Sequence, residues 1–116
     1  PELQAIGRRL GDALQAWVKA TEFLAGDAKN GLAGPLTAAV PYLHLAVTVC
    51  GGWLMGRAAL AAASYLDRGE GDQVFYRGKI ATAHFYADQM LPQAAAYSAT
   101  VQAGGASLAA VSDEML

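Results

Sequence analysis

The apolar positions of residues 1–28 recur in steps of three and four, which is the period of one face of an α-helix. The polar residues fall on the opposite side by the same spacing, so the pattern predicts an amphipathic helix over this range. Pro1 and Glu2 suit a first turn, where a missing N–H costs nothing and a carboxylate meets the positive helix end. The apolar stripe consists of Leu3, Ile6, Leu10, Leu14, Trp17, Thr21 and Leu24.

A second, longer helix is predicted from about residue 36 to residue 66. Pro41 lies inside it and removes one backbone hydrogen bond, so we expect a kink or a restart at that point. Residues 67–71 combine glycine with charge, as turns do, and should end the helix.

A third helix is predicted from Asp72, a good N-cap residue, to about Gln102, with a kink at Pro92. Gly104 follows as a stop signal. Residues 106–116 fit either a short terminal helix or an ordered tail. The main apolar stripe of this helix consists of Tyr76, Ile80, Ala83, Ala87, Met90, Ala94, Tyr97 and Val101.

These elements predict an all-α fold, an up-and-down antiparallel bundle of three long helices with a short C-terminal helix as an option. At 116 residues, one domain covering residues 1–116 is the natural count. Because the chain begins with Pro1 rather than Met, we expect a processed protein or an excised piece of a longer one.

The chain is poor in charge for its size. Hydrophobic residues make up 54% and charged residues 16%, where about a quarter is usual. The net charge of 8 − 10 = −2 argues against holding nucleic acid by charge, and the hydrophobicity argues against disorder. No charged residue occurs from Asn30 to Gly56 or from Gln89 to Ser112. We therefore expect faces that are hidden against a partner, and self-association of the isolated chain as a homo-oligomer.

The first uncharged stretch is longer than the roughly 20 residues that span a bilayer. However, it holds two prolines, His44 and paired glycines, and no positive cluster flanks it to set an orientation. A buried bundle helix explains it better, so we predict no transmembrane segment. The N-terminus does not resemble a cleavable signal. Cys50 is the single cysteine, which favours an intracellular, cytoplasmic location.

Four small residues share one face of the second helix at spacings of four, three and four. Glycine inside a helix costs up to about 1 kcal/mol relative to alanine, so we interpret this face as a close helix–helix contact. Chance in a chain rich in glycine and alanine is the alternative. The four residues are Gly52, Gly56, Ala59 and Ala63.

Little in the sequence could carry chemistry. His44 and His84 are the only histidines, and a zinc or di-iron site needs three or four ligands. Asp88 follows His84 by four residues, a pair that more often forms a surface contact on a helix. Cys50 lies in an apolar helix, where a thiol is normally inert. We therefore predict no catalytic, cofactor-binding or metal-binding residue in the chain.

The sequence does offer residues that could face a partner protein. Arg57 is the one charge within an otherwise uncharged helix interior, so it either pairs with a partner or reaches out to solvent along the surface. The third helix carries a second, weakly polar stripe that a three-helix core would not need, although ordinary core packing is the alternative. That set consists of Phe75, Thr82, Phe85 and Tyr86, with Gln93 in line.

Several segments resemble the extra C-terminal domain of certain bacterial acyl-CoA dehydrogenases, the group that includes methylmercaptopropionyl-CoA dehydrogenase. The resemblance covers nearly the whole chain, and its motifs are packing residues rather than catalytic ones. The segments are Pro41-Tyr42-Leu43, Gly51-Gly52-Trp53-Leu54, Arg57-Ala58-Ala59-Leu60, residues 75–83, Phe85-Tyr86-Ala87, Leu91-Pro92, residues 104–107 and Asp113-Glu114.

The resemblance implies a helical appendage that follows the catalytic part of an FAD-dependent flavoprotein of fatty acid metabolism. In such oxidoreductases a glutamate removes the α-proton of the acyl-CoA while the flavin accepts the β-hydride. None of the four glutamates of this chain matches that motif. The resemblance thus implies a non-catalytic domain, excised from a longer flavoenzyme, that serves packing, subunit association or shaping of the acyl-CoA site. By itself it should be inactive and hold no FAD.

Three alternatives remain at this stage. The chain could be a free-standing helical protein-interaction module, which would have the same helices. It could be a membrane-associated helical hairpin. It could also be a small ligand-binding bundle, for which Arg57, Tyr42 and His44 are the polar candidates.

Overall fold

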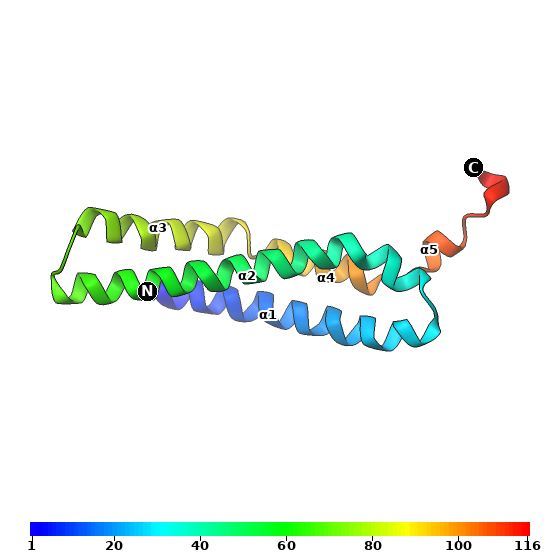
Figure 1. Cartoon of the computed structure of the whole chain (residues 1–116), viewed down its shortest axis with the longest axis horizontal. Helices are drawn as coiled ribbons and strands as arrows, with labels where there is room; N and C mark the ends of the chain where they lie inside the picture. The colour runs from blue at the N-terminus through cyan, green and yellow to red at the C-terminus, as the bar shows by residue number, and fades with distance from the viewer.

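The computed structural model describes all residues from Pro1 to Leu116 and contains helices without any β-strand (Figure 1). The all-α prediction is therefore confirmed, with three long helices among the elements. In chain order these are α1 (Glu2–Asp27), η1 (Ala28–Asn30), α2 (Ala33–Arg68), α3 (Gln73–Gln89), α4 (Gln93–Gln102), α5 (Ala106–Ala109) and η2 (Asp113–Met115).

Helix α1 matches the predicted range to within a residue at each end. Its apolar stripe faces α2 and α4, and Ile6, Ala13 and Ala20 are its buried residues. The helix passes into the short 3-10 turn η1. Gly31 then follows with φ 116, a backbone conformation that favours glycine, before α2 begins.

Helix α2 has 36 residues and passes through Pro41 without interruption. Of the two outcomes expected at Pro41, a kink or a restart, the restart does not occur: the missing N–H costs one hydrogen bond, and the remaining turns of the helix are long enough to tolerate the loss. At its other end, Gly69 is left-handed with φ 66. The Gly69 N–H donates to Leu66 O at 3.0 Å and the Glu70 N–H donates to Tyr65 O at 3.1 Å, which is the Schellman motif.

The predicted third helix is two helices. Asp72 caps α3 as expected, because its Oδ1 accepts hydrogen bonds from the N–H groups of Val74 and Phe75 at 3.0 and 3.1 Å. The helix ends at Gln89, and α4 starts at Gln93. Between them, the Leu91 N–H donates to Tyr86 O at 3.2 Å, five residues back. Pro92 has no N–H to continue the ladder, and the turn places Leu91 in the core, so the kink becomes a break.

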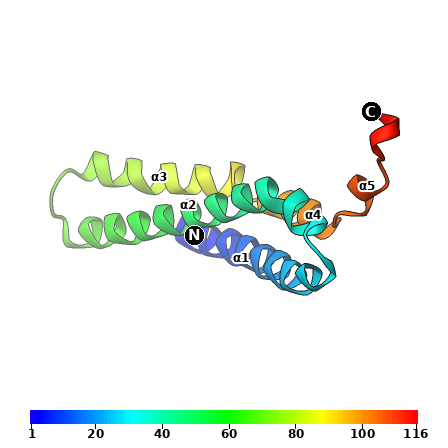
Figure 2. The same ribbon diagram turned by 45° about the vertical axis from the view of Figure 1, so that its right-hand side comes forward.

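The helices form a narrow rod of 67 × 27 × 18 Å. In Figures 1 and 2, α2 runs back along α1, and α3 followed by α4 returns along α2. The hairpin end of α2 and α3 projects beyond the N-terminus of α1 (Figure 1). Residues 106–116 form the short helix α5 and the turn η2, which lead away from the rod.

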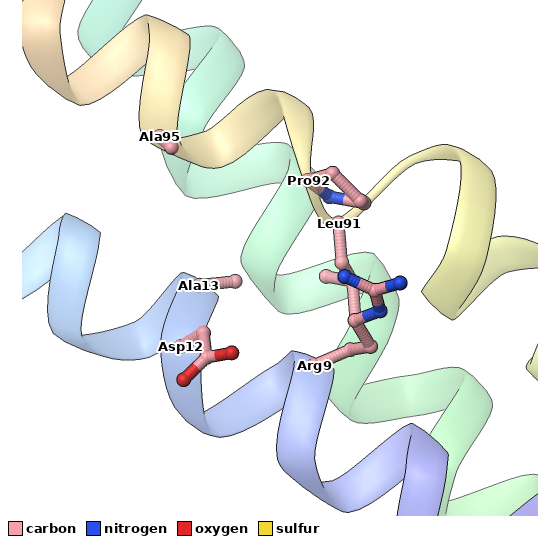
Figure 3. Close-up of a pocket in the computed structure, with 6 residues that line it drawn as sticks. All are labelled: Arg9, Asp12, Ala13, Leu91, Pro92 and Ala95. Carbon is pink, nitrogen blue, oxygen red and sulfur yellow. The ribbon is translucent and has the colours of Figure 1, made fainter.

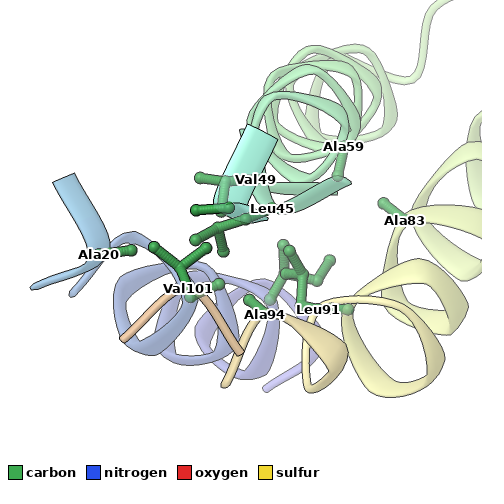
Figure 4. Packing of buried hydrophobic residues seen from close by; sticks show 12 residues of the cluster. Ala20, Leu45, Val49, Ala59, Ala83, Leu91, Ala94 and Val101 are labelled. Carbon is green, nitrogen blue, oxygen red and sulfur yellow. The ribbon is translucent and has the colours of Figure 1, made fainter. Parts of the chain in front are cut away.

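The core is thin and made largely of alanine. Only 16 of 116 residues are buried, and the largest fully buried side chains are Leu45, Leu91 and Val101. Figure 4 shows Leu45 and Val49 of α2 pointing to the side where Val101 lies, while Ala59 faces toward Ala83. Small side chains let the helices approach closely, and they leave large apolar side chains for the outside.

Candidate functional site

The side chains that could bind a metal ion are not clustered on the rod. No group of three or more His, Cys, Asp or Glu side chains lies within reach of one metal ion. His84 Nε2 lies 3.5 Å from Asp88 Oδ2, and Arg9 Nε lies 3.5 Å from Asp88 Oδ1. All three side chains are a third to a half exposed, so this is a surface ion-pair network of modest energy.

A hollow of about 230 Å³ lies where the break between α3 and α4 meets α1. Figure 3 shows Arg9 of α1 reaching toward Leu91 and Pro92 across it. Asp12 lies in the same hollow. The Asp12 carboxylate beside the arginine would repel a phosphate group, and it is the one acid–base group beside Arg9 in the lining, with no Ser, Cys, Lys or His as a nucleophile or second acid–base partner.

Arg57 lies at the surface of α2, and its guanidinium carbon is 5.0 Å from the centroid of the Trp53 ring. The ion pairs of the structure do not include it. It borders an apolar groove of about 290 Å³ between α1 and α2. The cation–π contact holds the charge at the rim of the groove while its stem covers apolar surface. The groove is lined by Leu3, Ile6, Gly7, Leu10, Trp53, Gly56, Arg57 and Leu60.

The polar candidates for a ligand-binding bundle do not converge. Tyr42 Oη shares a hydrogen bond of 2.9 Å with Thr21 Oγ1. The His44 ring stacks on Tyr97, with centroids 5.4 Å apart. Arg57 lies about 20 Å further along α2, at 1.5 Å per residue. These three side chains therefore do not form one site.

The small residues of α2 lie on its inner side. A Cβ on Gly52 would lie 2.6 Å from Leu91 Cδ2 and 3.3 Å from Leu10 Cδ1. A Cβ on Gly56 would lie 3.8 Å from Ile6 Cγ2, in ordinary contact. Ala59 is fully buried and Ala63 is half-buried. The absence of a side chain at Gly52 thus makes the space into which Leu91 and Leu10 pack.

Tyr86 turns inward rather than toward a partner. Its Oη donates to the backbone oxygen of Thr48 in α2 at 2.9 Å, and the ring fills the space beside Gly51 of the same helix. Burial raises the pKa of the Tyr86 phenol above its ordinary value of 10.0, and the neighbouring Cys50 raises it further. The spacing of the stripe could not separate Tyr86 from Thr82, because both lie near the boundary between the two faces of α3.

The other residues of that stripe do face outward. Phe75 and Phe85 are 54% and 65% exposed, and Val74 is exposed beside them. Thr82 is exposed and donates to Gly78 O of its own helix at 2.9 Å. The outer surface of α3 therefore presents two aromatic rings, and Lys79 Nζ lies over one of them, 5.2 Å from the centroid of the Phe75 ring.

A larger exposed apolar surface, which the sequence reasoning did not single out, lies along α2. Leu36, Val40, Leu43, Val47 and Leu54 are all 58–70% exposed. The sequence carries a signal for this surface, because these five residues follow one another at spacings of four, three, four and seven within the uncharged stretch. By length and composition alone α2 could cross a bilayer, with a mean hydropathy of 1.4 and a third of the window buried, and a core helix of a soluble protein passes the same test.

Comparison with known proteins identifies the family of the chain. The family described as "Acetyl-CoA dehydrogenase C-terminal like" matches residues 1–112. The chain is 34% identical over 105 residues to the 3-methylmercaptopropionyl-CoA dehydrogenase of Ruegeria pomeroyi. That match covers 90% of this chain and 18% of the relative, so the chain spans less than a fifth of its length. The chain belongs to the family of C-terminal domains of acyl-CoA dehydrogenases.

Proposed function

We propose that this chain is the non-catalytic C-terminal domain of an FAD-dependent acyl-CoA dehydrogenase, and that it packs against the catalytic domains and supports subunit association. In this proposal the up-and-down antiparallel bundle is a rigid module, and the flavin and acyl-CoA belong to the rest of the enzyme. We further propose a cytoplasmic location, which the single free thiol of Cys50 supports.

One observation carries this proposal. The domain buries only 16 of 116 residues, while 19 large hydrophobic side chains are exposed. A stand-alone protein rarely leaves apolar surface uncovered along whole helices, and such surfaces mark sites of protein interaction. The aromatic outer surface of α3 is our candidate for the contact with the catalytic domains, since interfaces between domains of one chain combine apolar and polar groups as this one does.

The residues of the chain do not fit FAD. The glycine-containing turn before α3 also carries Glu70 and Asp72, and Asp72 Oδ1 already accepts hydrogen bonds from the N–H groups of Val74 and Phe75 that a pyrophosphate would need. The hollow with the most basic lining holds Arg8 and Arg9 but also Asp12 and Asp88, whose carboxylates oppose an anion. We therefore assign no step of a flavin reaction to this chain.

A two-polypeptide experiment tests the proposal. The catalytic domains encoded in the same gene and this chain would be produced separately, mixed, and analysed by size-exclusion chromatography with flavin absorbance. We expect flavin only on the catalytic part, co-elution of the two, and a higher melting temperature of the catalytic part in the mixture.

Phe85→Asp supplies the matched variant for that mixture. It places a charge at the centre of the α3 outer surface without touching the core. The affinity of the chain for the catalytic part should fall about tenfold or more, and co-elution should be reduced accordingly. Val111→Asp, in the exposed tail, serves as the control. Stoichiometric flavin on the 116-residue chain alone would contradict the proposal. A gene that encodes no flavin-binding domains would contradict it as well, in favour of a free-standing interaction module.

A further inference from the structure

A continuous apolar stripe runs along the solvent side of α2. We define the outer stripe of α2 by six exposed residues whose spacings are four, three, four, three and four. This is the alternation of the a and d positions of a coiled coil, with valine at two of the three a positions and leucine at two of the three d positions. The stripe consists of Leu36, Val40, Leu43, Val47, Cys50 and Leu54.

The stripe is exposed to solvent, and Cys50 lies at its edge, where it also lines a hollow with Leu14 and Trp17 of α1. The core residues of α2, such as Leu45, Val49 and Gly52, lie on the opposite side of the helix, about half a turn away. Helices α1, α3, α4 and α5 contact α2, and the buried residues of α2 all lie on that inner side or at its margin. Figure 4 shows labelled core side chains of α2, such as Leu45 and Val49, pointing toward the other helices. Five of the six residues of the outer stripe are 58–70% exposed, so most of the stripe faces solvent.

We propose that the outer stripe of α2 binds the same stripe of a second copy, antiparallel, about a two-fold axis near residue 45. This deepens the proposed function, on which it rests, because it assigns the surface for subunit association. In this arrangement Leu36 lies opposite Leu54 of the second copy, Val40 opposite Cys50, and Leu43 opposite Val47. Each residue of the stripe thus meets another residue of the stripe, as a two-fold interface requires.

Charge favours this direction and this register. No charged residue occurs from Asn30 to Gly56, so the only charges in the overlap are the two Arg57 side chains, which lie at opposite ends of the antiparallel pair. In a parallel pair, Arg57 at the next d position would face Arg57 of the second copy. In the antiparallel pair it faces Ala33, at the start of α2. A shift by one heptad toward the C-terminus would bring Arg57 opposite Val40 and bury its charge.

The size of the contact predicts a weak dimer. The overlap from residue 33 to residue 57 is about 36 Å long at 1.5 Å per residue, and a helix is about 10 Å wide. The footprint is on the order of 360 Å² per copy, about half of what a stable interface buries on each partner. The dimer should therefore depend on concentration in this domain alone.

Disulfide trapping tests the register directly. In the Val40→Cys variant, the new thiol of each copy lies opposite Cys50 of the other copy. The two-fold axis makes this contact occur twice in the dimer, each time within the reach of a disulfide. Mild oxidation should give a covalent dimer in which position 40 of each copy is linked to Cys50 of the other, mapped by mass spectrometry. The unaltered chain, whose Cys50 faces Val40, should crosslink at least about tenfold more slowly. Gln15→Cys on the exposed side of α1 controls for random collision. Rapid Cys50–Cys50 crosslinking of the unaltered chain would overturn the antiparallel arrangement.

A charge in the stripe tests the surface independently. Val47→Glu should weaken self-association in sedimentation equilibrium by about tenfold or more, with unchanged helical circular dichroism. Phe85→Glu, equally exposed on α3, should leave self-association unchanged. A monomer up to millimolar concentration, or dimerisation lost in Phe85→Glu alone, would overturn the proposal.

The alternative is that the outer stripe of α2 binds a membrane surface, and the same variants distinguish the two. Binding to phosphatidylglycerol vesicles that Val47→Glu abolishes, without disulfide trapping of the Val40→Cys variant, would overturn the proposal in favour of a membrane surface. The trapping experiment needs no catalytic domain. A failure of the trapping experiment would therefore overturn the dimer without touching the proposed function. The proposed function is tested separately, by co-elution of this chain with the flavin-bearing catalytic domains.

Discussion

Single residues decide how closely the helices approach. Gly52 lies where a Cβ would meet Leu91 at 2.6 Å, whereas a Cβ on Gly78 of α3 would meet nothing within 4 Å. Both residues are glycines inside helices, and their sequence neighbourhoods do not tell them apart. The small-residue face of α2 could be predicted from spacing. The packing partner of Gly52 could not, since Leu91 reaches the core through a break in another helix.

The contrast between these two glycines gives a matched pair of substitutions. Gly52→Val should destabilise the fold by about 1–3 kcal/mol, because the added methyl groups overpack against Leu91 and Leu10. Gly78→Val should be neutral or slightly stabilising, since valine has the better helix propensity and the site is open. Urea unfolding followed by circular dichroism measures both. Equal effects at the two positions would contradict the packing described for α2.

Tyr86 links stability to pH. Because its folded pKa is raised above the unfolded value of 10.0, its stabilising contribution is complete below pH 10 and is lost as the pH rises through the folded pKa. Tyr86→Phe removes the hydrogen bond to Thr48 O and should cost about 1 kcal/mol at pH 7. Its stability should also fall less steeply above pH 10 than that of the unaltered chain. Parallel denaturation curves at pH 7 and above pH 10 measure both effects, and identical pH slopes would contradict a phenol whose pKa is raised by partial burial.

At the scale of elements, two prolines with the same sequence-based expectation gave different results. Pro41 lies inside an intact helix, and Pro92 separates two helices. Local sequence predicts that each removes a hydrogen bond, and that is true of both. It does not predict which one breaks the helix, because the break is stabilised by the burial of Leu91 against α1 and α2. The period of α1 and the cap at Asp72 are local properties, and they were predicted correctly.

The break between α3 and α4 depends on Leu91. Leu91→Ala should destabilise the domain by about 2–5 kcal/mol, because it leaves a cavity among three helices. Leu60→Ala, the same change at an exposed position of α2, should cost less than about 1 kcal/mol. Thermal unfolding of the two variants compares them. A small loss for Leu91→Ala would mean that the turn, rather than the buried side chain, maintains the break.

At the scale of the whole molecule, the low charge and the thin core have one origin. A sequence with alanine at the helix contacts builds a narrow rod, and its larger apolar residues then lie on the outer surfaces of α2 and α3. The deficit of charge could be read from the sequence. Which apolar face of α2 is buried could not, because both its inner and its outer side carry apolar residues at helical spacing.

The rod shape itself can be measured. The radius of gyration over Cα atoms is 18.7 Å, whereas a compact domain of this length has about 13 Å. Small-angle X-ray scattering at low concentration should give a value near 19 Å, because the hairpin end of α2 and α3 and the C-terminal segment both extend the molecule. A chain ending at residue 105 should remain a rod and melt within a few degrees of the full chain, since the removed residues are all exposed. A value near 13 Å would mean that the exposed faces fold back onto each other within one chain, and the apolar surfaces assigned to partners would then not exist.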